Sequence, residues 1–189
     1  MERQKVWEIV CEYVKTDYLR KHALAVEACM RYYAKIYGED EDSWGIVGLL
    51  HDFDFEIHLD ETTHPQSGEP ILREKGIPTD IIESILSHGD HLQHMYPRKT
   101  LRDKSLAAVD QLSGLCIAVA LVRPTKSIFD VEIKSVMKKW KNNSFAKTVI
   151  REEVLRYSEE LGISLEENIQ RTINALRENA DMLELKGIQ

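Results

Sequence analysis

The sequence has little that is typical of a secreted or membrane protein. Its three cysteines, Cys11, Cys29 and Cys116, are an odd number without a CxxC pair, so they predict no disulfide framework. The longest uncharged apolar run, 111–122, is shorter than the roughly 20 residues of a membrane-spanning helix. Charged side chains interrupt the first ten residues, where a secretory signal would be apolar. We therefore expect a cytoplasmic protein that does not bind a membrane.

The sequence also lacks a surplus of positive charge. Its 25 Lys and Arg residues against 32 Asp and Glu give a net charge of -7. A protein that neutralises nucleic acid phosphates needs basic residues in excess on one face, so we expect no binding to a nucleic acid duplex. A small anionic substrate would need a local positive centre, such as a metal ion or a few basic side chains.

What the sequence does have is helical periodicity along nearly its whole length. Alternating patterns of strand length are hard to find, so we predict an all-α fold. A single domain over residues 1–189 is expected from the length and from a globular composition of 43% apolar and 30% charged residues. The predicted helices cover about 3–14, 22–37, 44–50, 65–75, 79–88, 101–122, 131–141, 145–161 and 165–185.

Asp110 is the strongest anomaly in the pattern. Its helical neighbours three and four residues away are uncharged, as is the residue one further turn along: Leu106, Ala107, Ser113, Gly114 and Ile117. Burying an unpaired carboxylate is very costly, so a cation should compensate it. That cation could be a basic side chain of another helix or a metal ion, and both alternatives stay open at this point.

The dipeptide His51-Asp52 directly follows an apolar run, 46–50, so both side chains emerge where a buried helix ends. An imidazole suits Zn, Fe, Mn, Co or Ni, and a carboxylate extends the choice towards Mn or Mg. A histidine at a helix C-terminus is also favoured by the helix dipole alone. The pair by itself therefore does not decide between a ligand and a structural role.

The order His22, then His51-Asp52, then Asp110, each on or at the edge of a predicted helix, resembles the signature of the HD superfamily of metal-dependent phosphohydrolases. Residues 49–55 are similar to that family's apolar run into the HD dipeptide, and 64–68, His-Pro-Gln-Ser-Gly, to the His-Pro-x-x-Gly segment of its HDIG branch. Residues 85–91 are similar to its next histidine-bearing segment. The resemblance covers about residues 20–115 and implies a compact multi-helix HD-domain bundle, with its core over about 20–125.

The resemblance implies a set of metal ligands. His22, His51, Asp52 and Asp110 match the residues that hold the family's first metal.

In two-metal branches, including the HD-GYP cyclic dinucleotide phosphodiesterases, the histidines matching His64 and His88 hold a second ion, and Asp52 would bridge both. This chain lacks the Gly-Tyr-Pro element, which disfavours hydrolysis of cyclic-di-GMP. Gly89 stands where many two-metal members have a second consecutive histidine. One ion and two ions therefore both stay open.

The implied cofactor is a divalent transition metal, Mn, Fe, Co, Ni or Zn, with Mg also compatible. Such an ion lowers the pKa of a bound water and offsets charge on a phosphoryl oxygen. The catalytic candidates are Asp52, Asp54, His88 and His91, and the candidates for contact with substrate phosphate are Lys21, Arg98 and Lys99.

The predicted function is therefore hydrolysis of a small phosphate ester or nucleotide, by a phosphomonoesterase or phosphodiesterase. Two alternatives remain: a di-iron oxygenase of the HD type, and a non-catalytic metal-binding module that senses a nucleotide. The helices of 127–189 carry no motif, and we expect them to cover the core or to form a homodimer surface.

Overall fold

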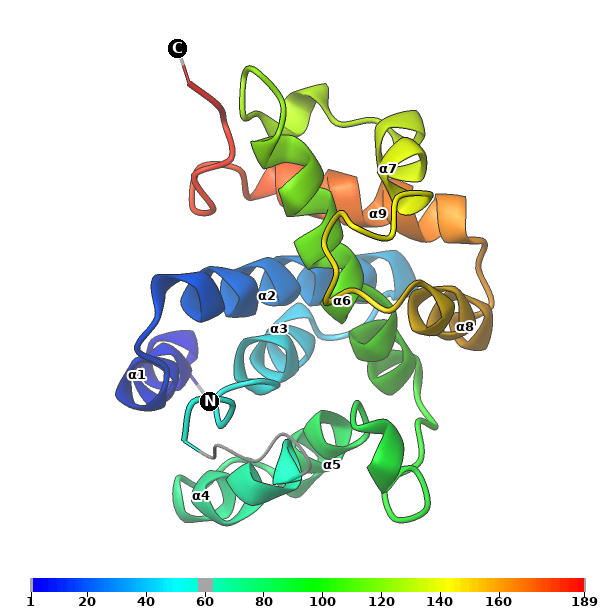
Figure 1. Ribbon diagram of the computed structural model, residues 1–189. Coiled ribbons are helices and arrows are strands. Elements are labelled where there is room, and N and C mark those ends of the chain that lie inside the picture. Colours follow the sequence, from blue (N-terminus) through cyan, green and yellow to red (C-terminus); the bar gives the residue numbers. More distant parts are fainter. Residues whose placement is uncertain (1, 58–62, 189) are drawn as a thin grey trace. The chain divides into compact units, whose positions relative to one another are not determined.

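The computed structural model describes residues 2–57 and 63–188, and every regular element among them is a helix (Figure 1). The predicted all-α fold is confirmed. The chain divides into two compact units, residues 1–106 and 107–189, which are described one at a time.

The first unit contains three long helices, two shorter ones and two 3-10 turns. They are α1 (Arg3–Tyr13), α2 (Asp17–Tyr37), α3 (Glu41–Leu50), η2 (Gln66–Gly68), α4 (Glu69–Glu74), α5 (Thr79–Leu86) and η3 (Asp90–Leu92). The helix α6 (Leu101–Leu121) begins in this unit and continues into the second. The second unit adds η4 (Ile128–Asp130), α7 (Ile133–Trp140), α8 (Arg151–Leu161) and α9 (Leu165–Glu178).

Several helix ends differ from the prediction, and tertiary contacts account for the first of them. The helix α2 begins at Asp17, not at His22. Glu56, distant in sequence, accepts hydrogen bonds from the backbone N–H groups of Lys15 and Thr16 just before the helix. His22 therefore lies in the second turn of α2, and not at its edge.

Other differences lie at α3, α4, α8 and α9. The N-cap of α3 is Asp40, whose carboxylate accepts from the backbone N–H groups of Asp42 and Ser43, so the helix begins at Glu41, before the predicted start at 44. The predicted helix of 65–75 is divided into η2 and α4. In the second unit α8 starts at Arg151, six residues later than predicted, and α9 ends at Glu178, seven residues earlier.

The helices α2 and α3 pack side by side and form the centre of the first unit (Figure 1). Their close approach depends on Gly48, because a Cβ atom there would lie 2.9 Å from the carbonyl oxygen of Val26 and the backbone nitrogen of Glu27. The whole stretch from Trp44 to Leu50 is buried. The sequence thus brings the C-terminal end of α3 against the face of α2 that carries His22.

The second unit is built on the amphipathic helix α9, whose buried face includes Ile169, Ile173 and Leu176. A buried amide joins three of its helices, because Asn168 Nδ2 donates to the carbonyl of Ala108 on α6 and to Ser158 Oγ on α8. This satisfied polar network fixes the register of α9 against α6 and α8.

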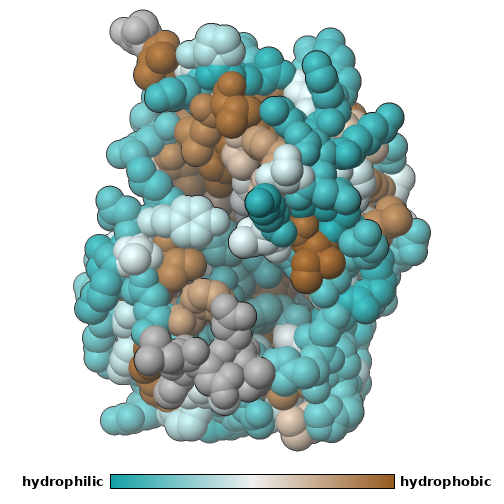
Figure 2. Space-filling model, in the orientation of Figure 1, coloured by the Kyte–Doolittle hydropathy of each residue, from teal (hydrophilic) through white to brown (hydrophobic). Residues whose placement is uncertain are grey.

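One helix in the described residues, α6, is long and apolar enough to cross a membrane, but 61% of its most apolar window is buried inside the structure. The core helix of a soluble protein has the same properties. Most of the surface shown in Figure 2 is hydrophilic, in keeping with the 30% of charged residues. The cytoplasmic location stays a prediction.

The contact at Gly48 yields a first prediction. Gly48→Ala should lower the free energy of unfolding by about 1–3 kcal/mol, because the new methyl group must push α2 and α3 apart. Gly114→Ala on α6 is the matched control: a Cβ there has no neighbour within 4 Å, so a helical alanine should stabilise the protein by about 1 kcal/mol. Urea denaturation measures both, and equal stability of Gly48→Ala and the wild type would contradict the packing.

Candidate metal centre

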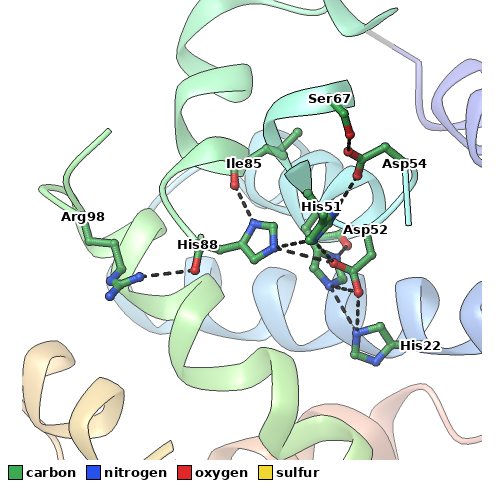
Figure 3. Close-up of polar contacts among 10 residues, drawn as sticks. His22, His51, Asp52, Asp54, Ser67, Ile85, His88 and Arg98 are labelled. Carbon is green, nitrogen blue, oxygen red and sulfur yellow. Dashed lines mark hydrogen bonds and ion pairs between the residues drawn. The ribbon is translucent and has the colours of Figure 1, made fainter. Parts of the chain in front are cut away.

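Four histidines of the first unit come together around the carboxylate of Asp52 (Figure 3). His22 projects from α2, and His51 is the C-terminal cap of α3. His64 comes just before η2, and His88 follows the end of α5. Elements far apart in sequence therefore supply the imidazoles, and the turn after α3 supplies the acid.

The two oxygens of Asp52 face different pairs of histidines. Oδ2 lies 3.5 Å from His22 Nε2 and 3.3 Å from His51 Nε2, and these two nitrogens are 3.2 Å apart. Oδ1 lies 3.0 Å from His64 Nε2 and 3.6 Å from His88 Nε2, which are 3.1 Å apart. We call His22, His51 and Asp52 the first group, and Asp52, His64 and His88 the second group; each could hold a metal ion.

The second ring nitrogens of His51 and His88 are fixed by backbone acceptors. His51 Nδ1 donates to the carbonyl of Gly48 at 2.7 Å, and His88 Nδ1 to the carbonyl of Ile85 at 2.6 Å. Because a carbonyl oxygen can only accept, Nδ1 of each ring carries a proton. In the neutral form of either ring Nε2 is then a bare lone pair, which is the form that binds a metal.

This arrangement fits a bound cation better than a metal-free hydrogen-bond network. The lone pairs of His51 and His88 point towards a carboxylate whose oxygens lie 3.3 and 3.6 Å away, and like-signed partners at that distance repel each other. Only a proton or a cation between them removes the repulsion. Imidazole nitrogen and carboxylate oxygen are also the donors that divalent transition metals take.

The electrostatics of the cluster keep Asp52 ionised. Burial alone would raise the pKa of Asp52, but the imidazoles of His51, His22 and His64 outweigh burial and hold that pKa well below its ordinary value. Burial likewise opposes the charged form of His64, yet hydrogen bonds to Asp52 and Asp54 raise its pKa to about 9. In the metal-free protein His64 is therefore protonated, and Asp52 and Asp54 stabilise its positive charge.

Asp54 lies behind His64 and holds its ring. Its Oδ1 accepts a 2.7 Å hydrogen bond from His64 Nδ1, and its Oδ2 accepts one of 2.8 Å from Ser67 Oγ. Burial would raise the pKa of Asp54, but the hydrogen bonds from His64 and Ser67 lower it. A carboxylate in this position orients a ligand histidine and increases its basicity. The predicted proton relay by Asp54 stays a prediction beside this observed contact.

Close packing explains the glycine of the His-Pro-x-x-Gly segment, Gly68. A Cβ atom on Gly68 would lie 2.6 Å from the ring of Phe53 and 3.0 Å from Cβ of Asp54. The turn that carries His64 and Ser67 can therefore lie directly on the segment that follows His51.

Gly89, the residue after His88, is constrained in the same way. A Cβ atom there would lie 2.9 Å from Cδ of Pro65. A larger residue at this position would push the His88 segment away from the His64 segment.

The remaining predicted residues lie in different settings. Lys21 lies on α2 next to His22, His91 belongs to η3, and Lys99 precedes α6; all three are exposed. Arg98 is buried, with a side chain 5% exposed.

Asp110, the fourth predicted ligand of the first metal, lies on α6 in the second unit, where its carbonyl accepts from Ser113 Oγ. Its ligand role stays a prediction. His58 lies outside the described residues.

Two contributors were missed from the sequence. Ser67 lies inside the His-Pro-x-x-Gly segment, at one of its variable positions. The motif therefore marks the segment but does not indicate a role for this serine. Gln93, which bonds the loop that carries His88, has no sequence signal, because a single amide in a polar loop is common.

The helical fold and the cluster of histidines and carboxylates define an all-α protein with a candidate divalent-metal site. Comparison with family models gives the same answer: the HD domain model matches residues 19–115, a span of 97 of the 189 residues. The chain belongs to the HD domain family, which indicates the superfamily of metal-dependent hydrolases. Neither the curated proteins nor the solved structures gave a match. The matched span includes His22, His51-Asp52, His64, His88 and Asp110.

The site predicts how His64 titrates without metal. Asp52→Asn should lower the pKa of His64 from about 9 towards the ordinary value of about 6.5, because it removes one of the two carboxylates that stabilise the imidazolium. Titration of the histidine ring signals by NMR in the presence of a chelator measures this. Asp80→Asn, a change at an exposed acid paired with Arg102, is the control and should leave the pKa of His64 where it is. An unchanged value in Asp52→Asn would contradict the observed contact.

Proposed function

We propose that the protein is a metal-dependent phosphohydrolase that acts on a small phosphate ester or nucleotide. The observation that carries the proposal is the sharing of one carboxylate, Asp52, between two pairs of imidazoles. A shared carboxylate is the arrangement expected where two ions lie roughly 3.5–4 Å apart and act on the two oxygens of a phosphoryl displacement.

The residues divide into two sets of ligands. His22, His51 and Asp52 Oδ2 would hold the first ion, and the family motif supplies Asp110 as the fourth ligand. Asp52 Oδ1, His64 and His88 would hold the second ion. Divalent cations so bound supply a nucleophile at neutral pH, by lowering the pKa of water, and an electrophile for the phosphoryl oxygens.

The metal would also be the main attraction for an anionic substrate. With a net charge of -7 the protein as a whole repels phosphate, so the local positive charge of the site has to outweigh that field. Exposed Lys21, beside His22, and Lys99 are the basic candidates for contact with a phosphate oxygen. His91, exposed on η3, is the candidate for proton transfer at the edge of the site.

A di-iron oxygenase is the second candidate, and the same observation favours it. That activity needs a second iron site, and the second group offers two imidazoles and one carboxylate oxygen. The two activities differ in their co-reactant, because an oxygenase consumes oxygen and a hydrolase does not.

The test combines metal analysis with an activity screen. We expect the purified protein to contain a divalent transition metal and to hydrolyse phosphate monoesters or phosphodiesters with Mn, Co, Ni, Mg or Fe. Oxygen uptake with no hydrolysis would support the oxygenase, and bound metal with neither activity would support a nucleotide-sensing module. Absence of bound metal under every loading condition would overturn the proposal.

Asp110→Ala tests the fourth ligand. Removing a direct ligand should lower metal affinity and activity by at least about 100-fold, which is the upper end of the cost of losing an outer contact to a ligand. Asp181→Ala, at an exposed acid of the second unit, is the matched control and should keep both. If Asp110→Ala kept its metal and its activity, the ligand assignment would be wrong.

A further inference from the structure

The loop that carries His88 has a feature that the proposed metal site does not by itself explain. The helix α5 ends at Leu86, so His88 is held outside regular structure. Its Nδ1 donates to the carbonyl of Ile85, which fixes the ring relative to α5. The backbone N–H groups of Ser87, His88 and Gly89 donate to the carbonyls of Glu83, Ile85 and Leu86, so this segment is tied to α5 through its N–H groups.

Two side chains bond the same segment through its three consecutive carbonyl groups. Arg98 Nη1 donates to the carbonyl of Ser87 at 3.1 Å and to that of His88 at 3.4 Å. Gln93 Nε2 donates to the carbonyl of Ser87 at 2.5 Å and to that of Gly89 at 3.3 Å. The carbonyls beyond a helix C-terminus lack helical partners, and here the donors come from the far end of the same loop.

The two side chains are themselves fixed. Arg98 Nη2 donates to Asp90 Oδ1 at 2.6 Å, and the backbone N–H of Arg98 donates to Gln93 Oε1 at 3.1 Å. The Arg98 side chain is only 5% exposed. Figure 3 shows the guanidinium reaching the backbone of His88 on the side opposite the metal ligands. A charged group this buried, with its donors directed at the loop, is poorly placed to meet a substrate phosphate.

The loop is also pressed against the other half of the second group. Gly89 lies so close to Pro65, the residue after His64, that a Cβ atom would be 2.9 Å from its Cδ. The Arg98 contacts hold the loop from one side and Pro65 limits it from the other. A shift of this loop would therefore change the 3.1 Å separation of His64 and His88 directly.

We propose that Arg98 is a positioning residue for the second metal position, and that it acts by holding the His88 loop. Its planar fork bonds two carbonyls and a carboxylate at once, which the single ammonium of a lysine does not reproduce. The inference rests on the proposed metal site. It goes beyond that site because it makes metal binding at one of the two positions depend on a residue that touches neither ion nor substrate.

The experiment measures metal stoichiometry in the full-length protein. Wild type, Arg98→Lys, Arg98→Ala and Gln93→Ala are titrated with Mn²⁺ or Co²⁺, and bound metal per chain is determined. We expect two ions in the wild type. In the Arg98 variants one ion should bind as before, and the affinity for the other should fall by about 10–100-fold, as for other contacts that orient a ligand. Gln93→Ala should show the same pattern more weakly.

The matched control is a second arginine of this unit that also contacts α5. Arg102 donates to Ser84 Oγ, to Ser43 Oγ and to the carbonyl of Asp80, away from the His88 loop. Arg102→Ala should lower stability and leave the ratio of the two metal affinities unchanged. This separates positioning of His88 from a general loss of packing around α5.

Each outcome has a defined reading. Two ions of unchanged affinity in Arg98→Lys and Gln93→Ala would overturn the inference and leave the proposed function standing, even if Arg98→Ala failed to fold. A raised KM for a phosphate ester with unchanged metal affinities would assign Arg98 to the substrate and overturn it as well. A single ion in the wild type would refute the second position but not a one-metal hydrolase. No ion in the wild type would refute both proposals.

Discussion

The carboxylate of Asp52 is the constraint on which the site depends. It is half-buried, it has imidazole nitrogens at 3.0–3.6 Å on both of its oxygens, and its pKa is held well below the ordinary value. An ionised acid in such a place requires positive charge nearby, since burying it unpaired would cost several kcal/mol. The helices around it bring four imidazoles to this carboxylate from four separate segments of one chain.

The absence of a side chain at three glycines lets those segments lie close together. Gly48 lets α3 lie on α2, Gly68 lets the His64 turn lie on the segment after His51, and Gly89 lets the His88 loop lie on Pro65. Each is a point where a single methyl group would separate two ligand-bearing segments. Dense packing transmits such a displacement to the histidines, so these glycines support the candidate metal centre although none can bind a metal.

The all-α fold and the histidines of the candidate site could be predicted because both leave local signals. Helices can be recognised from the periodic spacing of their apolar residues, and a His-Asp pair directly after an apolar run differs clearly from the residues before it. The start of α2 could not be predicted in the same way, because Glu56 caps it from 40 residues away. The setting of Arg98 was equally hidden: a basic residue in a polar loop suggests contact with solvent or substrate, and only the folded chain turns its guanidinium inward.

The two acids beside His64 act differently when a cation replaces the proton. The bond from His64 Nε2 to Asp52 exists only while Nε2 is protonated, because in the neutral ring that nitrogen is a lone pair. The bond from Nδ1 to Asp54 is present in both forms, because Nδ1 keeps its proton. With a cation bound, Asp52 would face the cation in place of the His64 proton, whereas Asp54 would hold the ring in both forms. The His64 ring is therefore already oriented in the metal-free protein. A cation that binds there would displace the proton on Nε2, and the ring would not need to turn.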